Sequence, residues 1–299
     1  MESASFWSVD LHVHTPGSAD AKAEAYGTPE AIVRAAIAAD LDAIAITDHN
    51  SAEWCDRVAQ AAKESSLIVL PGVEISTTEG HLLAIWEEGT PSAVINDLLA
   101  RLKIGHAERG KLDIAASVGF AAAAEEVAEL KGLAIAAHID RPKGLLKMEV
   151  KAHLVSTLLN EALCAVEVVH SDAIAEVDLK VKGHRELAYV QGSDTWDQAT
   201  SAHGLSGIGK RRTWIKAGRA DLAGIRHALA DPELRVRLEE PPAVEYPYIE
   251  TVEIFGGFLA GLKVGFSRDL NCLLGGTGTG KSLILEAIRF AMNQQLDRR

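Results

Sequence analysis

Short apolar runs alternate with amphipathic stretches along most of this chain of 299 residues. Several of the runs, such as AIAIT, LAIAAHI and AVEVVH, are continuously apolar. Such runs are typical of parallel strands that are buried on both faces. We therefore predict strands over residues 8–14, 43–47, 67–75, 82–86, 133–139, 165–170, 187–192 and 213–216.

Helical periodicity fills the segments between these strands. Thr28 and Pro29 provide an N-cap and a first helical residue for the stretch EAIVRAAIAADL. Further helices are predicted from Ser51 onward and over residues 91–103, 120–131, 150–163 and 219–231. The repeated alternation of strand and helix predicts an α/β fold, either a (β/α) barrel or a distorted version of one.

The pattern changes at the proline-marked stretch Glu239-Glu240-Pro241-Pro242. We predict a domain boundary there, with one domain over residues 1–240 and a second segment over residues 241–299. The second segment holds two glycine-interrupted, strand-like stretches in ETVEIFGGFLAGLKVGF, then an apolar strand at NCLL and a helix SLILEAIRFAMNQQL.

Composition is that of an ordinary soluble protein, with 47% hydrophobic and 24% charged residues. No apolar run is long enough to span a membrane, and the first residues lack the pattern of a signal peptide. We therefore expect a cytoplasmic protein with no membrane partner. The three cysteines, Cys55, Cys164 and Cys272, show no metal or disulfide spacing and are predicted to be buried as small hydrophobic residues.

A formal net charge of −12 argues against a broad nucleic-acid clamp, which needs lysine and arginine to neutralise phosphates. The local run Lys210-Arg211-Arg212, with Lys216 and Arg219, could still steer an anionic substrate. The simpler interpretation of this run is a solvated loop and strand edge.

Histidines and carboxylates gather at the predicted strand ends. His12 and His14 end the first strand, and side chains at i and i+2 of a strand point the same way. Groups that could bind a metal also follow or begin later strands: His49 in TDHN, Glu74 in PGVEIST, His81 seven residues on, His138 in AAHIDRP and Asp194 in GSD. The C-terminal strand ends of such barrels form one rim, which carries the catalytic groups. Unpaired charges are costly to bury, so packing alone does not explain this set.

The motifs DLHVHT, TDHN, PGVEIST with a following GH, AAHIDRP and GSD, in that order, resemble the polymerase and histidinol phosphatase (PHP) superfamily over residues 8–218. This resemblance implies a distorted (β/α)7 barrel that binds two to three Zn, Mn or Fe ions. It also implies an enzyme, a metal-dependent phosphoesterase that acts as a phosphatase or as a phosphodiesterase or nuclease.

The resemblance also implies a ligand set, assigned motif by motif. One ion would be held by His12, His14, Glu74 and Asp194. Glu74 would bridge to a second ion, which His81 and His138 would complete. A third ion would use Asp20, His49 and one more histidine.

That last histidine departs from the family pattern. Family members usually have Ser-Asp-x-His, whereas this chain has Ser193-Asp194-Thr195-Trp196. The later Ser201-Ala202-His203 is similar to the second half of that motif, displaced by a seven-residue insertion. We therefore assign His203 as the third-site ligand; the alternative is a loop histidine in solvent.

The catalytic residues that we expect are Glu74, Asp194 and Arg141. Arg141 follows His138 closely and could hold a phosphate oxygen, although a surface arginine before Pro142 is an equal alternative. Asp10 and Asp48 lie next to predicted ligands, where each could accept a hydrogen bond from a histidine ring and fix its tautomer. A structural role is an equal alternative for both.

A phosphate-binding motif, GGTGTGKS, lies between NCLL and the last helix. Its phosphate- and Mg²⁺-binding residues would be Gly275, Gly278, Gly280, Lys281 and Ser282, with ATP as the ligand. The helix is similar to the first helix of ABC-type ATPases of the recombination and chromosome-maintenance kind. Because the sequence stops at Arg299, it has no Walker B aspartate, and we expect a truncated fusion rather than a complete ATPase.

The substrate stays open between a phosphomonoester, such as histidinol phosphate or a nucleotide, and a nucleic acid. The phosphate-binding motif favours nucleic acid, whereas the acidic charge and few aromatic residues favour a small substrate. A second hypothesis is an ATP-binding module whose barrel is regulatory or structural. A third hypothesis is a plain barrel with incidental histidines. The oligomeric state is not predicted.

Overall fold

The computed structural model describes residues 4–147, 153–181, 184–242, 246–268 and 270–294. They divide into two compact units, one over Phe6–Pro241 and one that combines the residues up to Ser5 with those from Pro242 onward. The two units are described separately below.

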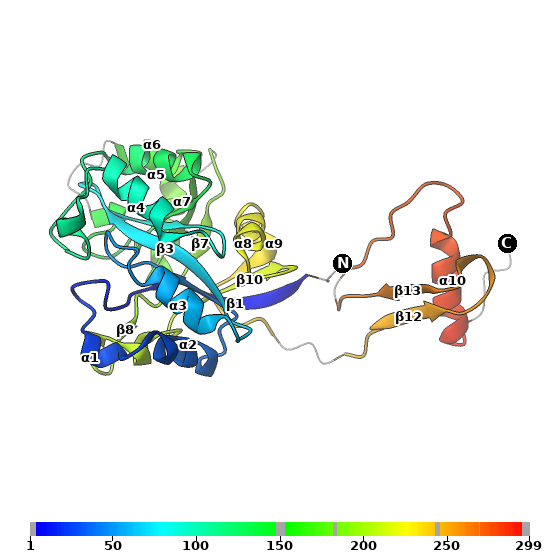
Figure 1. The fold of residues 1–299 in the computed structure, drawn as a ribbon. Coiled ribbons are helices and arrows are strands. Elements are labelled where there is room, and N and C mark those ends of the chain that lie inside the picture. The colour runs from blue at the N-terminus through cyan, green and yellow to red at the C-terminus, as the bar shows by residue number, and fades with distance from the viewer. Residues whose placement is uncertain (1–3, 148–152, 182–183, 243–245, 269, 295–299) are drawn as a thin grey trace. The chain divides into compact units, whose positions relative to one another are not determined.

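A single sheet organises the first unit, with the strand order β11-β10-β1-β2-β3-β4-β5-β6-β7 (Figure 1). Each of the eight predicted strands is present, and the α/β barrel class is confirmed. Their bounds are β1 Ser5–Val13, β2 Ala43–Ile46, β3 Ile68–Ser76, β4 His81–Ile85, β5 Leu133–Ala136, β6 Leu163–Glu167, β7 Ala188–Val190 and β10 Thr213–Ala217, and the short β11 Val236–Arg237 pairs with β10.

The sheet curls into a nearly closed barrel. The Gln191 N–H donates to Thr213 Oγ1 at 2.8 Å, and that hydroxyl donates to the Gln191 carbonyl at 2.9 Å. These two hydrogen bonds join the end of β7 to the start of β10, so that strands far apart in the sheet order meet.

Strand β4 is the distortion in this barrel. The pairs β1–β2, β2–β3, β5–β6 and β6–β7 are parallel, whereas β4 is antiparallel to both of its neighbours. The reversal pairs His81 at the start of β4 with Ser76 at the end of β3. A residue at the beginning of β4 therefore lies on the rim formed by the carboxyl ends of the parallel strands.

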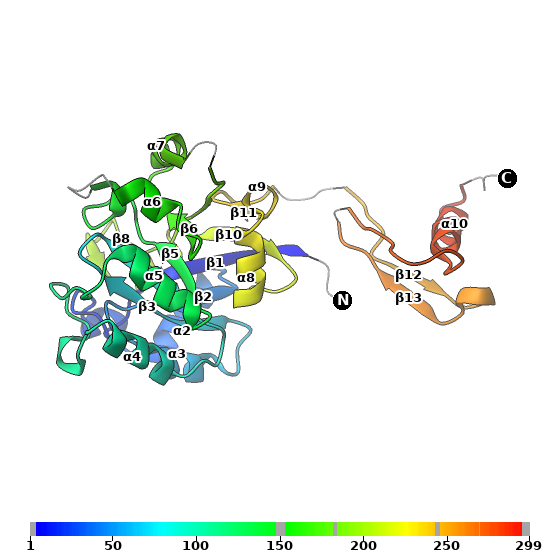
Figure 2. The same cartoon turned by 90° about the horizontal axis from the view of Figure 1, so that it is seen from above.

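Most helices pack around the outside of the sheet, as Figure 2 shows, whereas α8 contacts β10 and β6. The predicted helices appear with shorter bounds, and the start of the predicted helix 150–163 lies outside the described residues. The helix α7 was not predicted, although Ala173, Val177 and Val181 carry a helical apolar spacing. The helices are α1 Ala23–Tyr26, α2 Pro29–Ala38, α3 Cys55–Ala62, α4 Ser92–Arg101, α5 Phe120–Glu129, α6 Leu154–Leu158, α7 Asp172–Val181, α8 Leu222–Leu229 and α9 Pro232–Arg235.

Alternation along the strands divides the apolar residues into two clusters. One set, including Leu70, Leu83 and Ile135, packs inside the barrel with residues of α8. The other set lies on the outer face of the strands and packs against the helices. The site is therefore built on strands that are fixed by packing on both faces.

The second unit contains the antiparallel pair β12 Thr251–Ile254 and β13 Leu262–Gly265, followed by α10 Lys281–Ala291. The predicted strand at NCLL is wrong, because this stretch has no regular structure and Leu274 is 93% exposed. An extended segment needs a neighbouring strand for its backbone groups, and among the described residues β12 and β13 pair only with each other.

Two other expectations concern the cysteines and membrane-spanning helices. Cys55 is buried as predicted, but Cys164 is only half-buried and Cys272 is exposed, so the prediction is wrong for Cys272. Among the described residues, no helix has the length and apolar character needed to cross a membrane.

Asp10 holds the loops at the rim together. Its buried carboxylate accepts hydrogen bonds from the backbone N–H groups of Ser193 and Gly209, both at 2.9 Å, and of His12 at 3.3 Å. The expected bond to a histidine ring is therefore wrong, because backbone donors occupy this carboxylate. Asp10 ties the start of the chain to two loops that follow it by about two hundred residues.

We expect Asp10→Ala to lower the free energy of unfolding by about 2–5 kcal/mol, because it leaves buried N–H groups without an acceptor. Urea unfolding followed by circular dichroism measures this change. The exposed Asp97 is the matched control, and its alanine variant should stay within about 0.5 kcal/mol of the wild type. A loss below about 1 kcal/mol in Asp10→Ala would contradict the proposed role.

Candidate metal centre

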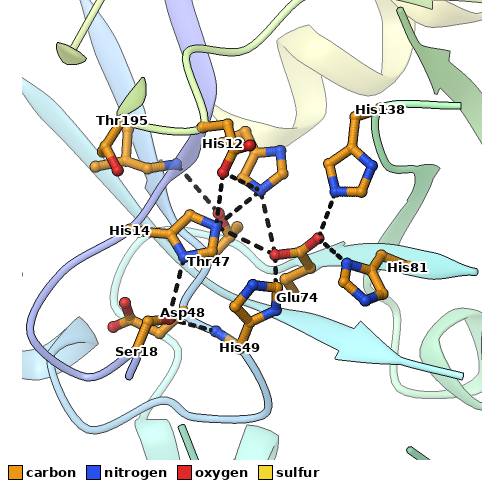
Figure 3. A network of polar contacts seen from close by, with 12 residues as sticks. His12, His14, Ser18, Thr47, Asp48, His49, Glu74, His81, His138 and Thr195 are labelled. Carbon is orange, nitrogen blue, oxygen red and sulfur yellow. Dashed lines mark hydrogen bonds and ion pairs between the residues drawn. The ribbon is translucent and has the colours of Figure 1, made fainter. Parts of the chain in front are cut away.

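Glu74 lies at the centre of the histidine cluster (Figure 3). Its side chain is fully buried and continues the inward-facing series of Ile68 and Leu70 on β3. Among the described residues, all of its ion-pair partners are histidines. The contacts to Oε1 are His81 Nδ1 at 2.7 Å and His138 Nε2 at 3.0 Å, and those to Oε2 are His49 Nδ1 at 3.0 Å, His14 Nε2 at 3.1 Å and His12 Nε2 at 3.3 Å.

The two oxygens of Glu74 thus face two separate groups of imidazoles. One group comes from β4 and the end of β5, and the other from β1 and the segment after β2. A carboxylate that is shared in this way can bridge two cations. The sequence assigned this bridging role to Glu74 from the resemblance, and the geometry fits it.

A strand irregularity turns the first two histidines inward. Val9 and Leu11 face the barrel interior, so strict alternation would point His12 and His14 outward. The register between β1 and β2 shifts between Asp10 and Val13. Such a bulge re-aims the side chains that follow it, which places both rings beside Glu74.

Left-handed backbone turns two further predicted ligands toward the cluster. His138 has a φ of 24° just after β5, and Asp194 has a φ of 54° just after β7. Thr195 also has a positive φ of 47°, which is strained for a β-branched residue. A hydrogen bond from the Tyr26 hydroxyl to Thr195 Oγ1 at 2.7 Å helps to hold this turn. Strain of this kind collects at functional sites.

The side chains predicted for the first ion site lie close together. His12 Nε2 and His14 Nε2 are 3.0 Å apart, and Asp194 Oδ1 lies 3.6 Å and 3.2 Å from them. Ligand atoms bound to one ion at about 2.0–2.2 Å lie roughly 3–3.6 Å apart. The spacing of these three atoms and of Glu74 Oε2 fits one ion.

The third predicted site gathers around Asp20. Its Oδ2 lies 3.4 Å from His49 Nε2 and 3.7 Å from His203 Nε2, and its Oδ1 lies 3.6 Å from His14 Nδ1. The seven-residue insertion forms the hairpin of β8 Trp196–Asp197 and β9 Ala202–His203. This hairpin returns His203 to the cluster instead of leaving it in solvent.

Some buried polar atoms of the cluster have no hydrogen-bond partner. Asp20 Oδ1, His49 Nδ1 and His138 Nδ1 are buried and have no hydrogen-bond partner. Buried polar atoms without partners are rare in folded proteins and need an explanation. A mixed set of imidazole and carboxylate ligands suits Zn, Mn or Fe, so the residues fit a transition-metal cluster.

The charges inside the cluster shift its pKa values. Burial raises the pKa of Glu74, but the charges of His49, His81 and His12 outweigh it and hold that pKa well below its usual value. Burial lowers the pKa of His49, while Glu74 and Asp20 more than reverse this effect and raise it to about 9. The pKa of His81 is lowered, because burial outweighs the attraction of Glu74. Without metal, protons supply part of the positive charge that the carboxylates need.

Glu167 is the functional residue that the sequence analysis missed. It ends β6, is buried, and accepts a hydrogen bond from His12 Nδ1 at 2.9 Å and from the His138 N–H at 2.7 Å. Gly192 leaves room for it, since a Cβ there would lie 2.6 Å from Glu167 Oε1. The available signal was a single carboxylate within the apolar run AVEVVH.

Two other predicted residues lie apart from the cluster or differ in role. Asp48 accepts hydrogen bonds from the N–H and hydroxyl of Thr15, so the expected bond to a histidine ring is wrong. The side chain of Arg141 is exposed, and its phosphate-binding role stays a prediction.

In the second unit, the glycine-rich loop turns into α10 through left-handed glycines. Gly278 has a φ of 79° and Gly280, the residue before the helix, a φ of 94°. Lys281 Nζ donates to the carbonyls of Gly275 and Gly276, both at 2.5 Å, and Ser282 is exposed. The loop is thus folded at a helix N-terminus, where backbone N–H groups favour anions.

Two protein families match the sequence. The PHP domain matches residues 10–204, and an AAA domain matches residues 251–299. A search of curated proteins found no match.

Several solved structures share the fold. The lesion-specific endonuclease PfuEndoQ from Pyrococcus furiosus is 18% identical with a TM-score of 0.56, over 77% of this chain and 57% of that one. An Endonuclease Q complex with a 27-mer duplex that carries an abasic lesion is also 18% identical, with a TM-score of 0.55 over 77% and 58% of the two chains. A two-domain protein with a predicted PHP-like phosphoesterase from Bacteroides vulgatus is 17% identical, with a TM-score of 0.53 over 78% and 64%. This chain thus spans less than two thirds of the length of each.

We expect Glu167→Gln to weaken metal binding by roughly 10- to 100-fold. The amide keeps the shape but loses one of the two acceptors that hold His12 and His138. Calorimetric titration of metal-free protein with Mn²⁺ measures this change. Glu129→Gln, on the exposed face of α5, is the control and should bind as the wild type does. Equal affinities in all three proteins would contradict the positioning role.

Apparent metal affinity should rise with pH between about 7 and 9. His49, with its pKa raised to about 9, is protonated at neutral pH in metal-free protein and must lose that proton to bind an ion. The same shift stabilises metal-free protein fully below the unfolded pKa of about 6.5, and this contribution is lost as the pH rises through 9. Titrations in two buffers of different ionisation enthalpy report the released protons. A pH-independent affinity without proton release would count against this account.

Proposed function

This chain belongs to the PHP domain family, and from that premise we propose that it hydrolyses phosphate esters with bound divalent transition-metal ions. The observation that carries the proposal is the buried carboxylate of Glu74, whose two oxygens face two groups of histidines. When bound, such ions would act as Lewis acids on the phosphoryl oxygens and lower the pKa of a water molecule.

The protein residues would hold and orient these ions and admit the substrate from one side. His12, His14 and Glu74 are fully buried, whereas the side chain of Asp194 is 27% exposed. Asp20 and His203 are also partly exposed. The ester would therefore approach from the side of Asp194, Asp20 and His203, where a reacting phosphate can reach the cluster.

Nucleic-acid phosphodiesters are the substrate class that we propose. Two of the similar structures are of endonuclease Q, one of them with a DNA duplex, and this supports the choice although the likeness is one of fold. The ions would be Zn, Mn or Fe, in line with the imidazole-rich ligand set.

A second candidate function is nucleotide binding by the C-terminal unit. It is favoured by the AAA domain match over residues 251–299 and by the loop at the N-terminus of α10. In this case Lys281 and Ser282 would bind ATP with Mg²⁺, and the barrel would have a regulatory or structural role.

We expect Glu74→Gln to lower kcat/KM for phosphate esters by at least roughly 1,000-fold, because both predicted ion sites lose a charged ligand. The assay compares a generic phosphodiester, a phosphomonoester, nucleotides and single-stranded oligonucleotides with Mn²⁺. Circular dichroism checks the fold, and Glu129→Gln is the matched control. Retention of more than about a tenth of the wild-type rate would refute the bridging role.

The same panel separates the two candidate functions. If ATP turnover persists in Glu74→Gln and disappears in Lys281→Ala, the nucleotide-binding unit is the active part. If Glu74→Gln abolishes all hydrolysis while Lys281→Ala keeps it, the metal cluster is responsible.

A further inference from the structure

A cavity of about 400 Å³ lies on the barrel unit beside the start of β10. Its volume is in the range of small-molecule sites, and the chemistry proposed for the metal cluster does not use it. It is lined by Gln191, Lys210, Arg211, Arg212, Trp214, Leu238 and Glu240.

Positive charge dominates this cavity. Lys210, Arg211 and Arg212 face a single acidic residue, Glu240, in a chain whose net charge is −12. The lining is therefore positively charged on a protein whose net charge is negative. Such a local positive charge attracts an anionic ligand.

Hydrogen bonds to carbonyls hold both guanidinium groups in place. Arg211 donates to the carbonyls of Gly192 at 2.9 Å and Ser193 at 2.8 Å, and Arg212 donates to those of Gly209 and Ala39. Carbonyl oxygens carry no net charge, so these bonds fix the cations without neutralising them. A fixed cation loses little side-chain entropy when an anion binds.

The cavity also offers an apolar surface. Trp214 is half-buried on β10, at a position that alternates with the inward-facing Ile215, and Leu238 lies in the same lining. An indole ring can stack on any nucleobase. Phosphate-binding cations together with a stacking surface suit a nucleotide better than an inorganic anion.

The cavity is connected to the metal cluster through one short segment. Gln191 lines the cavity, Arg211 holds the carbonyls of Gly192 and Ser193, and Asp194 follows directly. Asp194 Oδ1 lies 3.2 Å from His14 Nε2. The segment 191–194 thus connects the cavity with Asp194, on the partly exposed side of the cluster.

We propose that this cavity binds the nucleotide adjacent to the scissile phosphate, with its base against Trp214 and its phosphate on Lys210 and Arg211. The inference rests on the proposed function and makes it more specific. The substrate is then a single-stranded oligonucleotide or a strand end, because a base that stacks on Trp214 has to leave the base stack of a duplex. A simple phosphomonoester has no neighbouring nucleotide and would not use the cavity.

Binding to metal-free protein tests the cavity independently of catalysis. Fluorescence anisotropy of a labelled single-stranded six-nucleotide probe gives the Kd over a range of salt concentrations. Lys210→Ala should weaken binding by roughly 5-fold or more at low salt and reduce the salt slope by about 0.7, the value for one phosphate contact on a single strand. Trp214→Ala should weaken it by roughly 5- to 100-fold. If Trp214→Ala does not fold, Trp214→Leu is used in its place. Lys63→Ala, at an exposed lysine, is the charge-matched control for Lys210→Ala.

With Mn²⁺ present, Lys210→Ala should raise KM for the oligonucleotide. The ratio of kcat/KM for the oligonucleotide to kcat/KM for a generic diester should therefore fall. Lys63→Ala should leave that ratio at the wild-type value. The proposal is overturned if the wild type does not bind the probe, or if Lys210→Ala and the Trp214 variants bind it as the wild type does. Binding through the cavity without hydrolysis of any ester would instead refute the proposed function alone.

Discussion

The structure of the barrel unit depends on one buried carboxylate. Glu74 is surrounded by five histidine rings and has no lysine or arginine partner among the described residues. A buried charge of this kind is costly unless positive charge and hydrogen bonds compensate it. The reversal of β4, the bulge in β1, the left-handed His138 and the hairpin before His203 all direct imidazoles to this region. These irregularities are the places where the barrel departs from a regular fold.

The remaining buried carboxylates hold the frame around it. Asp10 accepts hydrogen bonds from backbone N–H groups, Asp48 accepts them from the N–H and the hydroxyl of Thr15, and both fix the loops at the rim. Glu167 contributes both to the frame and to the predicted ligands, because it accepts hydrogen bonds from the backbone N–H of His138 and from the ring of His12. The buried acidic residues thus divide into two groups. Some face the predicted ions, and the others hold the loops and histidines around them in position.

Much of the fold and part of the site could be predicted from the sequence. The strands were accessible because continuous apolar runs are a local signal, and the rim followed from barrel geometry. His81 could be assigned only by family resemblance, since nothing local shows that β4 is antiparallel. The bulge that re-aims His12 and the hairpin that returns His203 depend on pairing between strands, which a single sequence does not reveal. The strand prediction at NCLL is wrong for the converse reason. Its apolar pattern is that of a strand, but no strand in the described part of the chain pairs with it.

The most direct test of the account is a crystal structure of the protein with Mn²⁺, with anomalous scattering used to locate the ions. The account predicts two peaks on either side of Glu74. One should contact Oε1 together with His81 and His138, and the other Oε2 together with His12, His14 and Asp194. A map without peaks at Glu74, or with metal bound only elsewhere on the protein, would contradict the central claim.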